Sequence, residues 1–481
     1  MPTPPESISR VSRLAREHLE RVASDFDAAP DHHSWAALSY RAMLARHFRY
    51  FIPPDASVLE VGCGGGELLA RLANRDITGI DLSEKQLAQA RARLPHGTFY
   101  RQAGECLAID RTFDYIIVSD TLNLAADVQL LLERLISVSG TRTRLVINIQ
   151  SQLWRPLLDG MSALRLRRRP VANNWLARGD VINLLQLAGW DVVRCSSAIL
   201  CPLPLLGIDR LINRFVLPVV PALGLAVFLV ARPRPVATAA IPRTVSVILP
   251  ARNEAGNIEA AVLRIPEMGL GTELIFVEGH SRDDTWREIE RVKSAYPQLR
   301  IKSLRQTGNG KGNAVREGFA AASGEILMIL DTDLTVPPEE LLKFYHAVVE
   351  NRVEFANGSR LVYPMETRAM RFLNMCANKV IAAAFGWLLG QPLKDTLCGT
   401  KVLRREDYQK IAAHRDYFGD FDPFGDFDLL FGASKLSLKI GDIPIRYQDR
   451  AYGTTNIQRW RHGWLLLRMM VFAAKRVRFI G

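Results

Sequence analysis

The chain has 481 residues, and its ordinary share of hydrophobic and charged residues excludes a disordered, collagen-like or disulfide-framework protein. Its 62 Lys and Arg against 50 Asp and Glu give a net charge of +12, which indicates an anionic partner: phosphate, nucleic acid or a membrane surface. The six cysteines show no metal-binding or disulfide spacing, so we expect reduced, structural thiols in a cytoplasmic protein.

The alternation of apolar strands with helical patterns predicts an α/β protein of two domains, each built on a parallel sheet. A stretch rich in proline and small residues separates them, because it can continue neither a helix nor a central strand. An apolar run that contains two prolines precedes this stretch, and it predicts a loop and a strand at Ala226–Ala231 rather than a membrane helix. The predicted parts are a helical cap at 1–50, a first domain at 51–231, a linker at 232–243 and a second domain at 244–481.

The first domain opens with a strand that turns through glycines at Val58–Gly66 and then enters a predicted helix at Glu67–Ala73. Glycines let a ligand lie against the backbone, and a helix N-terminus offers N–H donors. A second strand, Ile77–Asp81, ends in an acid that can bind ribose hydroxyls. Two further strands follow at Phe113–Asp120 and Arg144–Gln150, with a helix between them.

These motifs together resemble the class I S-adenosylmethionine-dependent methyltransferases over roughly residues 50–200. The resemblance implies a Rossmann-like sheet of seven strands, with S-adenosylmethionine as the methyl donor. It also implies a cofactor site made of Glu60, Gly62, Gly64, Gly66 and Asp81. The family usually places an acid near the adenine after the third strand, where this chain reads Gln102-Ala-Gly-Glu105, so Glu105 is the substitute at a neighbouring position or the contact is lost.

Several points in this domain stay open on the sequence alone. Asp120 is the one candidate base near the methyl group, but a helix cap explains it equally well. The run Arg165–Arg169 is either a patch for an acceptor phosphate or a solvated loop. The whole domain is either a methyltransferase or a degenerate, non-catalytic binding or scaffold module.

The second domain repeats the pattern of strands that end in polar groups. A buried-type strand from Val245 ends at Pro250, Leu274–Glu278 ends in an acid, and Glu325–Leu330 leads into Asp331 and Asp333. In open α/β sheets ligands bind at the carboxyl edge of the strands, and paired carboxylates there can hold a divalent cation with a diphosphate. Ser281 is the predicted cap of the helix that follows the second strand.

Five motifs in order make residues 243–460 similar to family 2 glycosyltransferases of the GT-A fold, and most similar to the dolichol- or polyprenyl-phosphate sugar synthases. They are Leu249–Glu254, Gly310–Arg316, Gly358–Arg360, Asp395–Lys401 and Arg450–Asn456. The resemblance implies four groups of site residues: Pro250, Arg252, Glu254 and Glu278 for the nucleotide; Lys311 and Asp331 for the diphosphate; Asp331 and Asp333 for Mg²⁺ or Mn²⁺; and Arg360, Arg371, Lys401 and Arg450 for an acceptor phosphate.

Asp426, with Asp428 as the alternative, lies where many family members carry the base that an inverting transfer to a hydroxyl requires. A phosphate acceptor is already anionic and needs no such base. The usual acid pair after the second strand is Glu278-Gly279 here, and Asn456 replaces the Gln typical of processive synthases, which argues against a polymerase.

The C-terminal stretch 460–479 is predicted to be a basic amphipathic helix with tryptophan at one end, a pattern typical of helices on anionic membranes. A helix docked on one of the domains is the alternative. The sequence thus predicts a bifunctional enzyme, peripheral on the cytoplasmic membrane face, with a nucleotide-sugar donor, a lipid-phosphate acceptor and no nucleic-acid partner.

Overall fold

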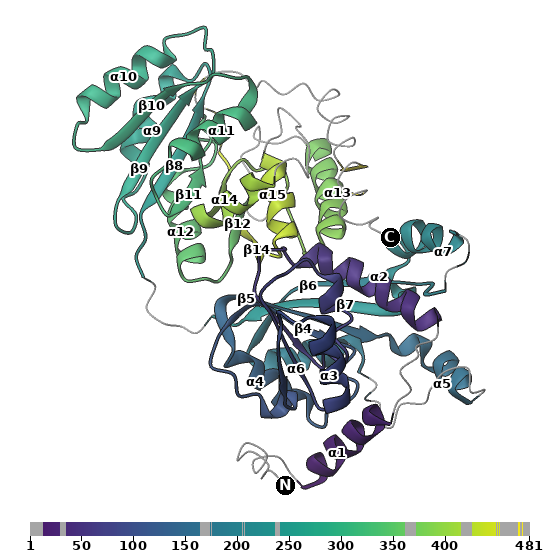
Figure 1. Cartoon of the computed structure of the whole chain (residues 1–481). Coiled ribbons are helices and arrows are strands. Elements are labelled where there is room, and N and C mark those ends of the chain that lie inside the picture. Colours follow the sequence, from purple (N-terminus) through teal and green to yellow (C-terminus); the bar gives the residue numbers. More distant parts are fainter. Residues whose placement is uncertain are drawn as a thin grey trace. The chain divides into compact units, whose positions relative to one another are not determined.

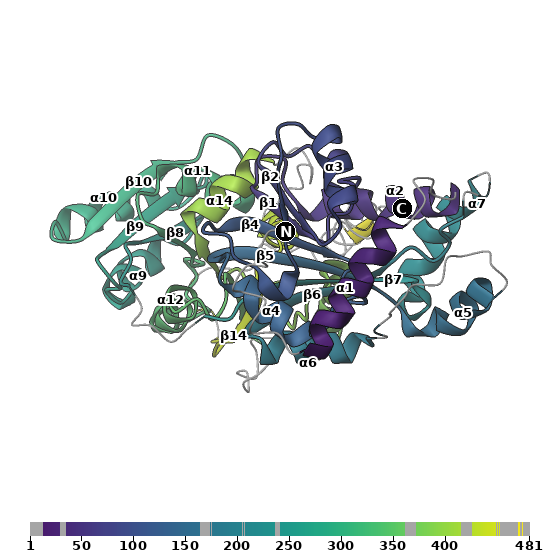
Figure 2. The ribbon, with the colours of Figure 1, turned by 60° about the horizontal axis from the view of Figure 1, so that its bottom comes forward.

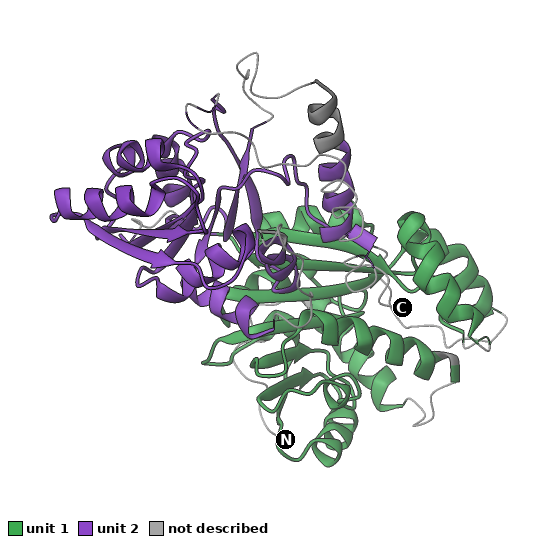
Figure 3. Ribbon diagram, turned by 90° about the horizontal axis from the view of Figure 1, so that it is seen from above, with its two compact units in different colours: residues 1–234, 478–481 green, residues 235–477 purple. Residues whose placement is uncertain are grey.

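The computed structural model describes residues 13–28, 35–163, 174, 176–203, 205, 207–235, 241–360, 372–414, 426–448, 450, 452, 470, 471 and 474. The chain divides into two compact units, residues 1–234 with 478–481 and residues 235–477, and each carries a sheet of seven strands (Figures 1 and 3). No helix within the described ranges is long and apolar enough to cross a membrane. The two α/β sheets confirm the predicted fold class.

The sheet of unit 1 has the strand order β3-β2-β1-β4-β5-β7-β6, in which β7 alone runs antiparallel to its neighbours. Its strands are β1 Val58–Val61, β2 Ile77–Asp81, β3 Thr98–Arg101, β4 Phe113–Ser119, β5 Ser139–Gln150, β6 Trp190–Ala198 and β7 Ala226–Pro233. The chain leaves β1 toward β3 and returns to β4, so the direction of winding reverses between β1 and β4. Ligands of such sheets bind at this reversal point, at the carboxyl ends of the strands.

Helices cover both faces of this sheet, with α3 on one face and α4 and α6 on the other (Figure 2). The described helices are α1 Arg13–Asp27, α2 Trp35–Phe51, α3 Glu84–Arg93, α4 Val128–Ile136, α5 Arg155–Ala163, α6 Arg178–Leu187, α7 Ile208–Leu211 and α8 Leu217–Val219. The central strands β1 and β4 are almost wholly buried, and their Val, Leu and Ile side chains join those of α4, α6 and β7 in one core. This packing holds the carboxyl ends of β1 and β4 in fixed positions.

Two local predictions in unit 1 are wrong. The helix predicted at Glu67–Ala73 is only a 3₁₀ turn at Leu69–Arg71, because three left-handed glycines turn the chain sharply and β2 begins soon afterwards at Ile77. The predicted linker was started too early, because β7 runs on to Pro233. A proline fits there because β5 pairs with β7 only as far as Ala231, so the lost N–H interrupts no ladder on that side.

Unit 2 has the strand order β10-β9-β8-β11-β13-β12-β14, with β13 antiparallel to both of its neighbours. Its strands are β8 Val245–Ala251, β9 Thr272–Glu278, β10 Arg300–Arg305, β11 Ile326–Ile329, β12 Phe355–Ser359, β13 Lys401–Arg404 and β14 Ile440–Pro444. Its helices are α9 Ile258–Arg264, α10 Thr285–Ala295, α11 Gly310–Ala321, α12 Leu341–Val349, α13 Phe372–Leu389, α14 Arg405–Ala413 and α15 Asp426–Lys435.

The winding of unit 2 reverses between β8 and β11. The carboxyl ends of β8, β9, β11, β12 and β14 and the start of β13 therefore meet at one edge of the sheet. Several predicted site residues of the second domain lie at these strand ends, among them Glu278, Asp331, Asp333, Arg360 and Lys401, so the topology brings them to one edge although they lie far apart in the sequence.

Candidate functional site

The glycine turn after β1 forms a close-packed backbone cradle in unit 1. Gly62, Gly64 and Gly66 all have positive φ angles, between 51° and 74°. A Cβ atom on Gly62 would lie 2.5 Å from Oγ1 of Thr121, a hydroxyl that donates to the carbonyl of Val61 at 2.8 Å. A side chain at this position would therefore strain the backbone and collide with the chain that follows β4.

Two acids of unit 1 line this cradle. Asp81 accepts hydrogen bonds from the backbone N–H groups of Gly64 (2.8 Å) and Ser83 (2.9 Å), while burial raises its pKa. Glu60 is buried, and its Oε2 has no hydrogen-bond partner among the described residues. Burial raises the pKa of Glu60 well above its usual value; the nearby Asp81 acts in the same direction and Arg41 opposes it. An unpartnered buried carboxylate oxygen beside a glycine cradle is suited to an amino or ammonium group of a ligand.

Asp120 follows β4 with a left-handed backbone (φ 54°), and its carboxylate is held from two sides. Asn148 Nδ2 donates to Oδ1 at 2.9 Å, and the Tyr40 hydroxyl donates to Oδ2 at 3.3 Å. The helix-cap alternative is wrong, because the side chain that caps α4 is Asp127. A non-glycine residue in this conformation is strained, and such residues concentrate at functional sites.

Sequence reasoning missed the contributions of α2 and β5 to this site. Tyr40 of α2 contacts Asp120, and Arg41 of the same helix forms an ion pair with Glu67 beside the glycine turn. The predicted cap at 1–50 therefore adds side chains to the edge where the cofactor is expected. The signal was weak, because one Tyr-Arg pair in a helical pattern does not reveal which strand end it meets.

Glu105 lies in a 3₁₀ turn after β3, and its side chain is buried. Its Oε1 accepts the backbone N–H groups of Ala126 (2.8 Å) and Asp127 (3.3 Å), which fixes the start of α4. This oxygen is therefore used to hold the chain, a role that the sequence did not indicate. The basic run 165–169 lies outside the described residues.

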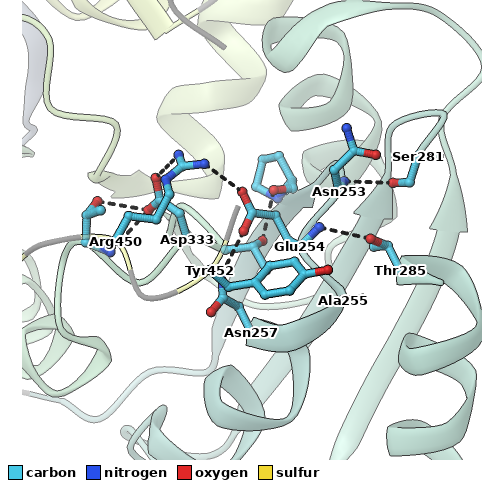
Figure 4. A network of polar contacts seen from close by, with 12 residues as sticks. Asn253, Glu254, Ala255, Asn257, Ser281, Thr285, Asp333, Arg450 and Tyr452 are labelled. Atoms are coloured by element: carbon cyan, nitrogen blue, oxygen red, sulfur yellow. Dashed lines mark hydrogen bonds and ion pairs between the residues drawn. The ribbon is translucent and has the colours of Figure 1, made fainter. Parts of the chain in front are cut away.

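In unit 2, Asp331 and Asp333 follow β11 and each is paired with a basic residue. Asp331 Oδ1 lies 2.5 Å from Lys311 Nζ, and Asp333 Oδ2 lies 2.6 Å from Arg450 Nη2 (Figure 4). Burial would raise the pKa of Asp331, but the charge of Lys311 and its hydrogen bond outweigh it and hold the pKa below its usual value. Two carboxylates and two cations therefore compensate one another at the sheet edge.

Arg450 also joins the two strands on either side of the reversal point. Its Nη1 lies 3.3 Å from Glu254 Oε1, while Asn257 Nδ2 donates to Oε2 of the same glutamate at 2.7 Å (Figure 4). Burial raises the pKa of Glu254 to about 7, although Arg450 acts in the opposite direction. Tyr452 lies beside this loop, and a Cβ atom on Gly256 would meet its ring at 2.6 Å. The segment with Arg450 and Tyr452 thus packs on the loop after β8.

The remaining nucleotide residues cluster around the ends of β8 and β9. The Pro250 carbonyl accepts the hydroxyl of Thr332 at 2.9 Å, and Arg252 is exposed. Glu278 Oε1 accepts the N–H of Ser281 at 2.5 Å. The prediction for Ser281 is wrong, because its hydroxyl accepts the N–H of Asn253 and the N-cap residue of α10 is Asp284.

Gly279 stands where the family usually carries a second acid, and the structure gives a reason for its lack of a side chain. A Cβ atom at Gly279 would lie 2.9 Å from Gln306 Oε1 and 3.6 Å from the carbonyl of Ala251. A carboxylate there would have to displace Gln306, whose amide donates to Gly310 at 2.7 Å and to Asn313 at 2.8 Å. Glu278 is therefore followed by glycine because Gln306 occupies the space that the side chain of a second acid would need.

Two of the residues predicted to surround an acceptor phosphate are already compensated inside unit 2. Arg360 donates to Asp395 from Nε (2.8 Å) and from Nη2 (3.0 Å), and Asp395 is fully buried. Lys401 is also fully buried and donates to the carbonyl of Cys398 at 2.6 Å. Both cations are thus compensated within unit 2, and their charges also help to lower the pKa of Asp331, so their contact with an acceptor phosphate stays a prediction. The predicted residue Arg371 lies outside the described residues.

The candidate bases are placed only in part. Asp426 is the first residue of α15, and its side chain lies outside the described set. Asp428, two residues further along the helix, is buried. The C-terminal stretch 460–479, predicted to contact a membrane, lies outside the described residues apart from three helical positions.

Comparisons with known proteins find a family match in each unit. Residues 58–139 match the family model described as a methyltransferase domain, and residues 246–412 match glycosyl transferase family 2. A dolichol-phosphate mannosyltransferase of Pyrococcus furiosus is 30% identical over 222 residues, which are 44% of this chain and 59% of that relative. The glycosyltransferase AglJ of Haloferax volcanii is 27% identical over 49% of this chain and 73% of its own length.

Among solved structures, glucosyl-3-phosphoglycerate synthase of Mycobacterium tuberculosis, in complex with Mn²⁺, uridine diphosphate and its product, aligns with a TM-score of 0.35 and 22% identity. The alignment covers 49% of this chain and 80% of that one. The chain spans less than two thirds of the length of the first curated relative. Each unit nevertheless contains a segment that matches a family model of its own, a methyltransferase domain in unit 1 and glycosyl transferase family 2 in unit 2.

Proposed function

We propose that unit 2 transfers a sugar from a nucleotide-sugar to a polyprenyl-phosphate-like or other anionic acceptor, and that the transfer depends on a divalent cation. The observation that carries the proposal is the pair of carboxylates at the reversal point of the sheet, Asp331 and Asp333, each matched by a cation. The named relative acts on dolichol phosphate, which supports a phosphate-bearing acceptor for this chain.

The carboxylate pair fits a divalent cation of the Mg²⁺ or Mn²⁺ type. Lys311 and Arg450 already place positive charge against both acids, which supports a role for this carboxylate pair in binding a cation. Within the described ranges no group of three or more His, Cys, Asp or Glu side chains converges, so a cation held by Asp331 and Asp333 would complete its shell with diphosphate oxygens. Bound there, it would stabilise the negative charge that develops on the nucleotide leaving group.

The residues of the chain then have separate tasks. Glu254 and Glu278, with Pro250 and Arg252, would hold the nucleoside beside β8 and β9. Lys311, at the start of α11, would turn from Asp331 toward the diphosphate, where its ammonium balances the incoming charge. Asp426 or Asp428 is needed as a base only if the acceptor is a hydroxyl, because a phosphate acceptor is already anionic at neutral pH.

A thermal-shift screen of nucleotides and nucleotide-sugars with Mg²⁺ or Mn²⁺ tests this proposal on the whole chain. We expect a stabilising donor, and we expect Asp333→Ala to remove the metal-dependent part of its shift and the transfer reaction. Glu406→Ala is the matched control, because Glu406 is an exposed acid on α14 in the same unit. Full activity of Asp333→Ala would refute the metal assignment.

For unit 1 the proposal is methyl transfer from S-adenosylmethionine. Its support is the unpartnered Glu60 Oε2 beside the three left-handed glycines, which fits the methionine amino group of the cofactor. Asp81 would bind the ribose hydroxyls. Asp120, which accepts hydrogen bonds from Asn148 and Tyr40, would take the proton that an O–H or N–H acceptor loses as it is methylated.

Calorimetric titration with S-adenosylmethionine separates this proposal from a degenerate binding or scaffold module. We expect heat of binding for the wild type and none for Gly64→Arg, because Gly64 has a left-handed φ and lies in the cradle. Binding that is absent from the wild type, or unchanged in the variant, would favour the non-catalytic module. If Asp120→Asn still binds S-adenosylmethionine but no longer transfers the methyl group, Asp120 is identified as the base that takes the proton of the acceptor.

A further inference from the structure

The segment of unit 1 between β6 and β7 carries apolar side chains on its outer side. It forms one continuous helical rod made of α7 (Ile208–Leu211), a π-helical turn (Ile212–Val216) and α8 (Leu217–Val219), followed by a 3₁₀ turn to Leu223. We call its exposed side chains the apolar face: Leu205, Ile208, Leu211, Phe215, Val216, Val219, Val220 and Leu223. The spacing of Ile208, Leu211, Phe215 and Val219 places them along one side of the rod.

The apolar face is exposed although the rod that carries it is held in place by hydrogen bonds and by buried side chains on its other side. Asn213 Oδ1 accepts the N–H groups of Leu200 (2.7 Å) and Cys201 (2.9 Å), and Asn213 Nδ2 donates to the carbonyl of Cys201. Leu217 and Pro218 are buried on the opposite side of the rod. The rod is therefore fixed by its inner side, while Val219 on the outer side is 71% exposed.

Helix α5 extends the apolar face. Leu153 and Leu157 are both exposed, and Trp154 Nε1 between them donates to the carbonyl of Leu223 at 2.8 Å. This bond ties the start of α5 to the end of the rod, and Figures 1 and 2 show α5 and α7 at the same end of unit 1. Isolated exposed leucines are ordinary, but a connected group of about ten large apolar side chains marks an interaction surface.

The charges around the face identify the partner. Arg210 and Arg214 lie one turn apart on the rod, and both are exposed. The only acid in the sequence from 199 to 225 is Asp209, which is buried, where its Oδ1 accepts the N–H groups of Leu205 (3.0 Å) and Gly207 (3.2 Å). The rod thus presents apolar side chains and arginine without an exposed acid, and Asp159, the exposed acid of α5, lies 3.5 Å from the guanidinium of Arg155. Apolar side chains combined with arginine are the pattern of helices that lie in an anionic bilayer interface.

The face also lies at a defined edge of the sheet. β5 and β6 end there at Gln150 and Ala198, and the antiparallel β7 begins there at Ala226. This is the carboxyl edge of the parallel strands, the edge that carries Glu60, Asp81 and Asp120. A bilayer in contact with the rod would therefore lie at the edge of unit 1 that holds the proposed methyl-transfer site.

We propose that unit 1 docks on an anionic lipid bilayer through the apolar face, with its aliphatic side chains and Phe215 in the interface and Arg210 and Arg214 at the lipid phosphates. This inference is independent of sugar transfer and of the predicted C-terminal helix, because it rests on residues of unit 1 alone. Membrane contact would place a lipid-linked methyl acceptor at the carboxyl edge of the sheet.

Co-sedimentation of the full chain with vesicles of phosphatidylcholine, with and without phosphatidylglycerol, tests the docking. We expect Phe215→Glu/Val219→Glu to weaken partition onto the anionic vesicles at least tenfold, because two inserted apolar side chains become charges. Arg210→Gln/Arg214→Gln should weaken it about fivefold per arginine and reduce the preference for anionic lipid. Leu187→Glu on α6 is the matched control, since Leu187 is exposed to a similar extent but lies outside the face.

Hydrogen exchange of the wild-type chain gives a second readout that does not depend on a variant or on another membrane-binding segment. Peptides from 205 to 223 should become protected when anionic vesicles are added, while peptides of α6 stay unchanged. Unchanged exchange in 205–223, or equal loss of partition in Leu187→Glu, would overturn the proposal. A vesicle-independent dimer that Phe215→Glu/Val219→Glu dissociates would assign the face to a protein partner and would also overturn it.

Discussion

The buried ion pair between Arg360 and Asp395 allows a sharp test of how unit 2 is held together. The Asp395 carboxylate accepts three hydrogen bonds from Arg360, from N (3.0 Å), Nε (2.8 Å) and Nη2 (3.0 Å), and a fourth from Leu397 N (3.0 Å). Burial alone would lower the pKa of Arg360, but the charge and hydrogen bonds of Asp395 outweigh it and raise the pKa. Arg360 is therefore charged at every accessible pH, and its compensation depends on Asp395.

Asp395→Asn keeps the shape of the side chain and removes its charge, so no cavity contributes to the result. The change leaves a buried guanidinium uncompensated and turns an amide N–H₂ toward its donors, and breaking such a pair costs about 3–5 kcal/mol. Replacing both partners, as Arg360→Met with Asp395→Leu, leaves no charge unpaired and should cost less than Asp395→Asn, with the remaining cost coming from the backbone N–H groups of Arg360 and Leu397, which lose their acceptor.

Hydrogen exchange of peptides from β12 and β13 across a urea series measures this cost in unit 2 separately from unit 1. A loss below about 1 kcal/mol in Asp395→Asn would refute the reasoning, because surface ion pairs reach that value. If Arg360 instead contacted an acceptor phosphate, Arg360→Lys would raise the KM for the acceptor and leave the free energy of unfolding unchanged.

Three further predictions concern single positions. The pKa of Glu254 is about 7 in the folded chain and near 4.5 when exposed, so the folded state keeps a proton that the unfolded state loses. Stability should therefore fall as the pH rises from about 4.5 to about 7, and Glu254→Gln should flatten that slope in thermal unfolding. Gly62→Ala places a Cβ atom 2.5 Å from Thr121 Oγ1 at a φ of +74° and should destabilise unit 1 by about 1–3 kcal/mol; an unchanged Tm would contradict this. Gly318→Ala, whose Cβ atom would lie 2.6 Å from a side chain of β8, should also cost about 1–3 kcal/mol, whereas Gly160→Ala on α5 meets nothing within 4 Å and should stabilise by about 0.5–1 kcal/mol. Chemical denaturation would disprove the packing argument if both alanines shifted stability in the same direction.

Strand-end logic explains why much of the site could be predicted. Acids at the ends of buried parallel strands meet at one edge of their sheet, so Glu60 and Asp81 of unit 1 could be grouped without coordinates, and likewise Glu278 and Asp331 of unit 2. The insertion of β7 between β5 and β6 could not be predicted, because an apolar strand does not reveal its neighbours. A full helix was predicted in place of the 3₁₀ turn at Leu69–Arg71, because the helical pattern does not reveal how many residues the preceding glycine turn takes up.

The pairing of charged side chains is a second feature of the structure that could not be predicted from the sequence. Arg450 and Asp333 are separated by 117 residues, Tyr40 and Asp120 by 80, and Arg360 and Asp395 by 35. A basic residue in a phosphate-binding motif has the same sequence pattern whether it faces a ligand or a buried carboxylate. The fold shows that Arg360 pairs with the buried carboxylate of Asp395, a contact that the sequence pattern does not reveal.

The position of β7 has a consequence for how the protein is made. β7 is the last strand of unit 1 in the chain, yet it fills the gap between β5 and β6. At a synthesis rate of about 5–20 residues/s, the nascent chain exposes the facing edges of β5 and β6 for seconds before Ala226–Pro233 emerges from the ribosome. During that interval a chaperone or the strands of a neighbouring nascent chain can compete for these edges, so truncation before Ala226 should yield an aggregating product rather than a smaller domain.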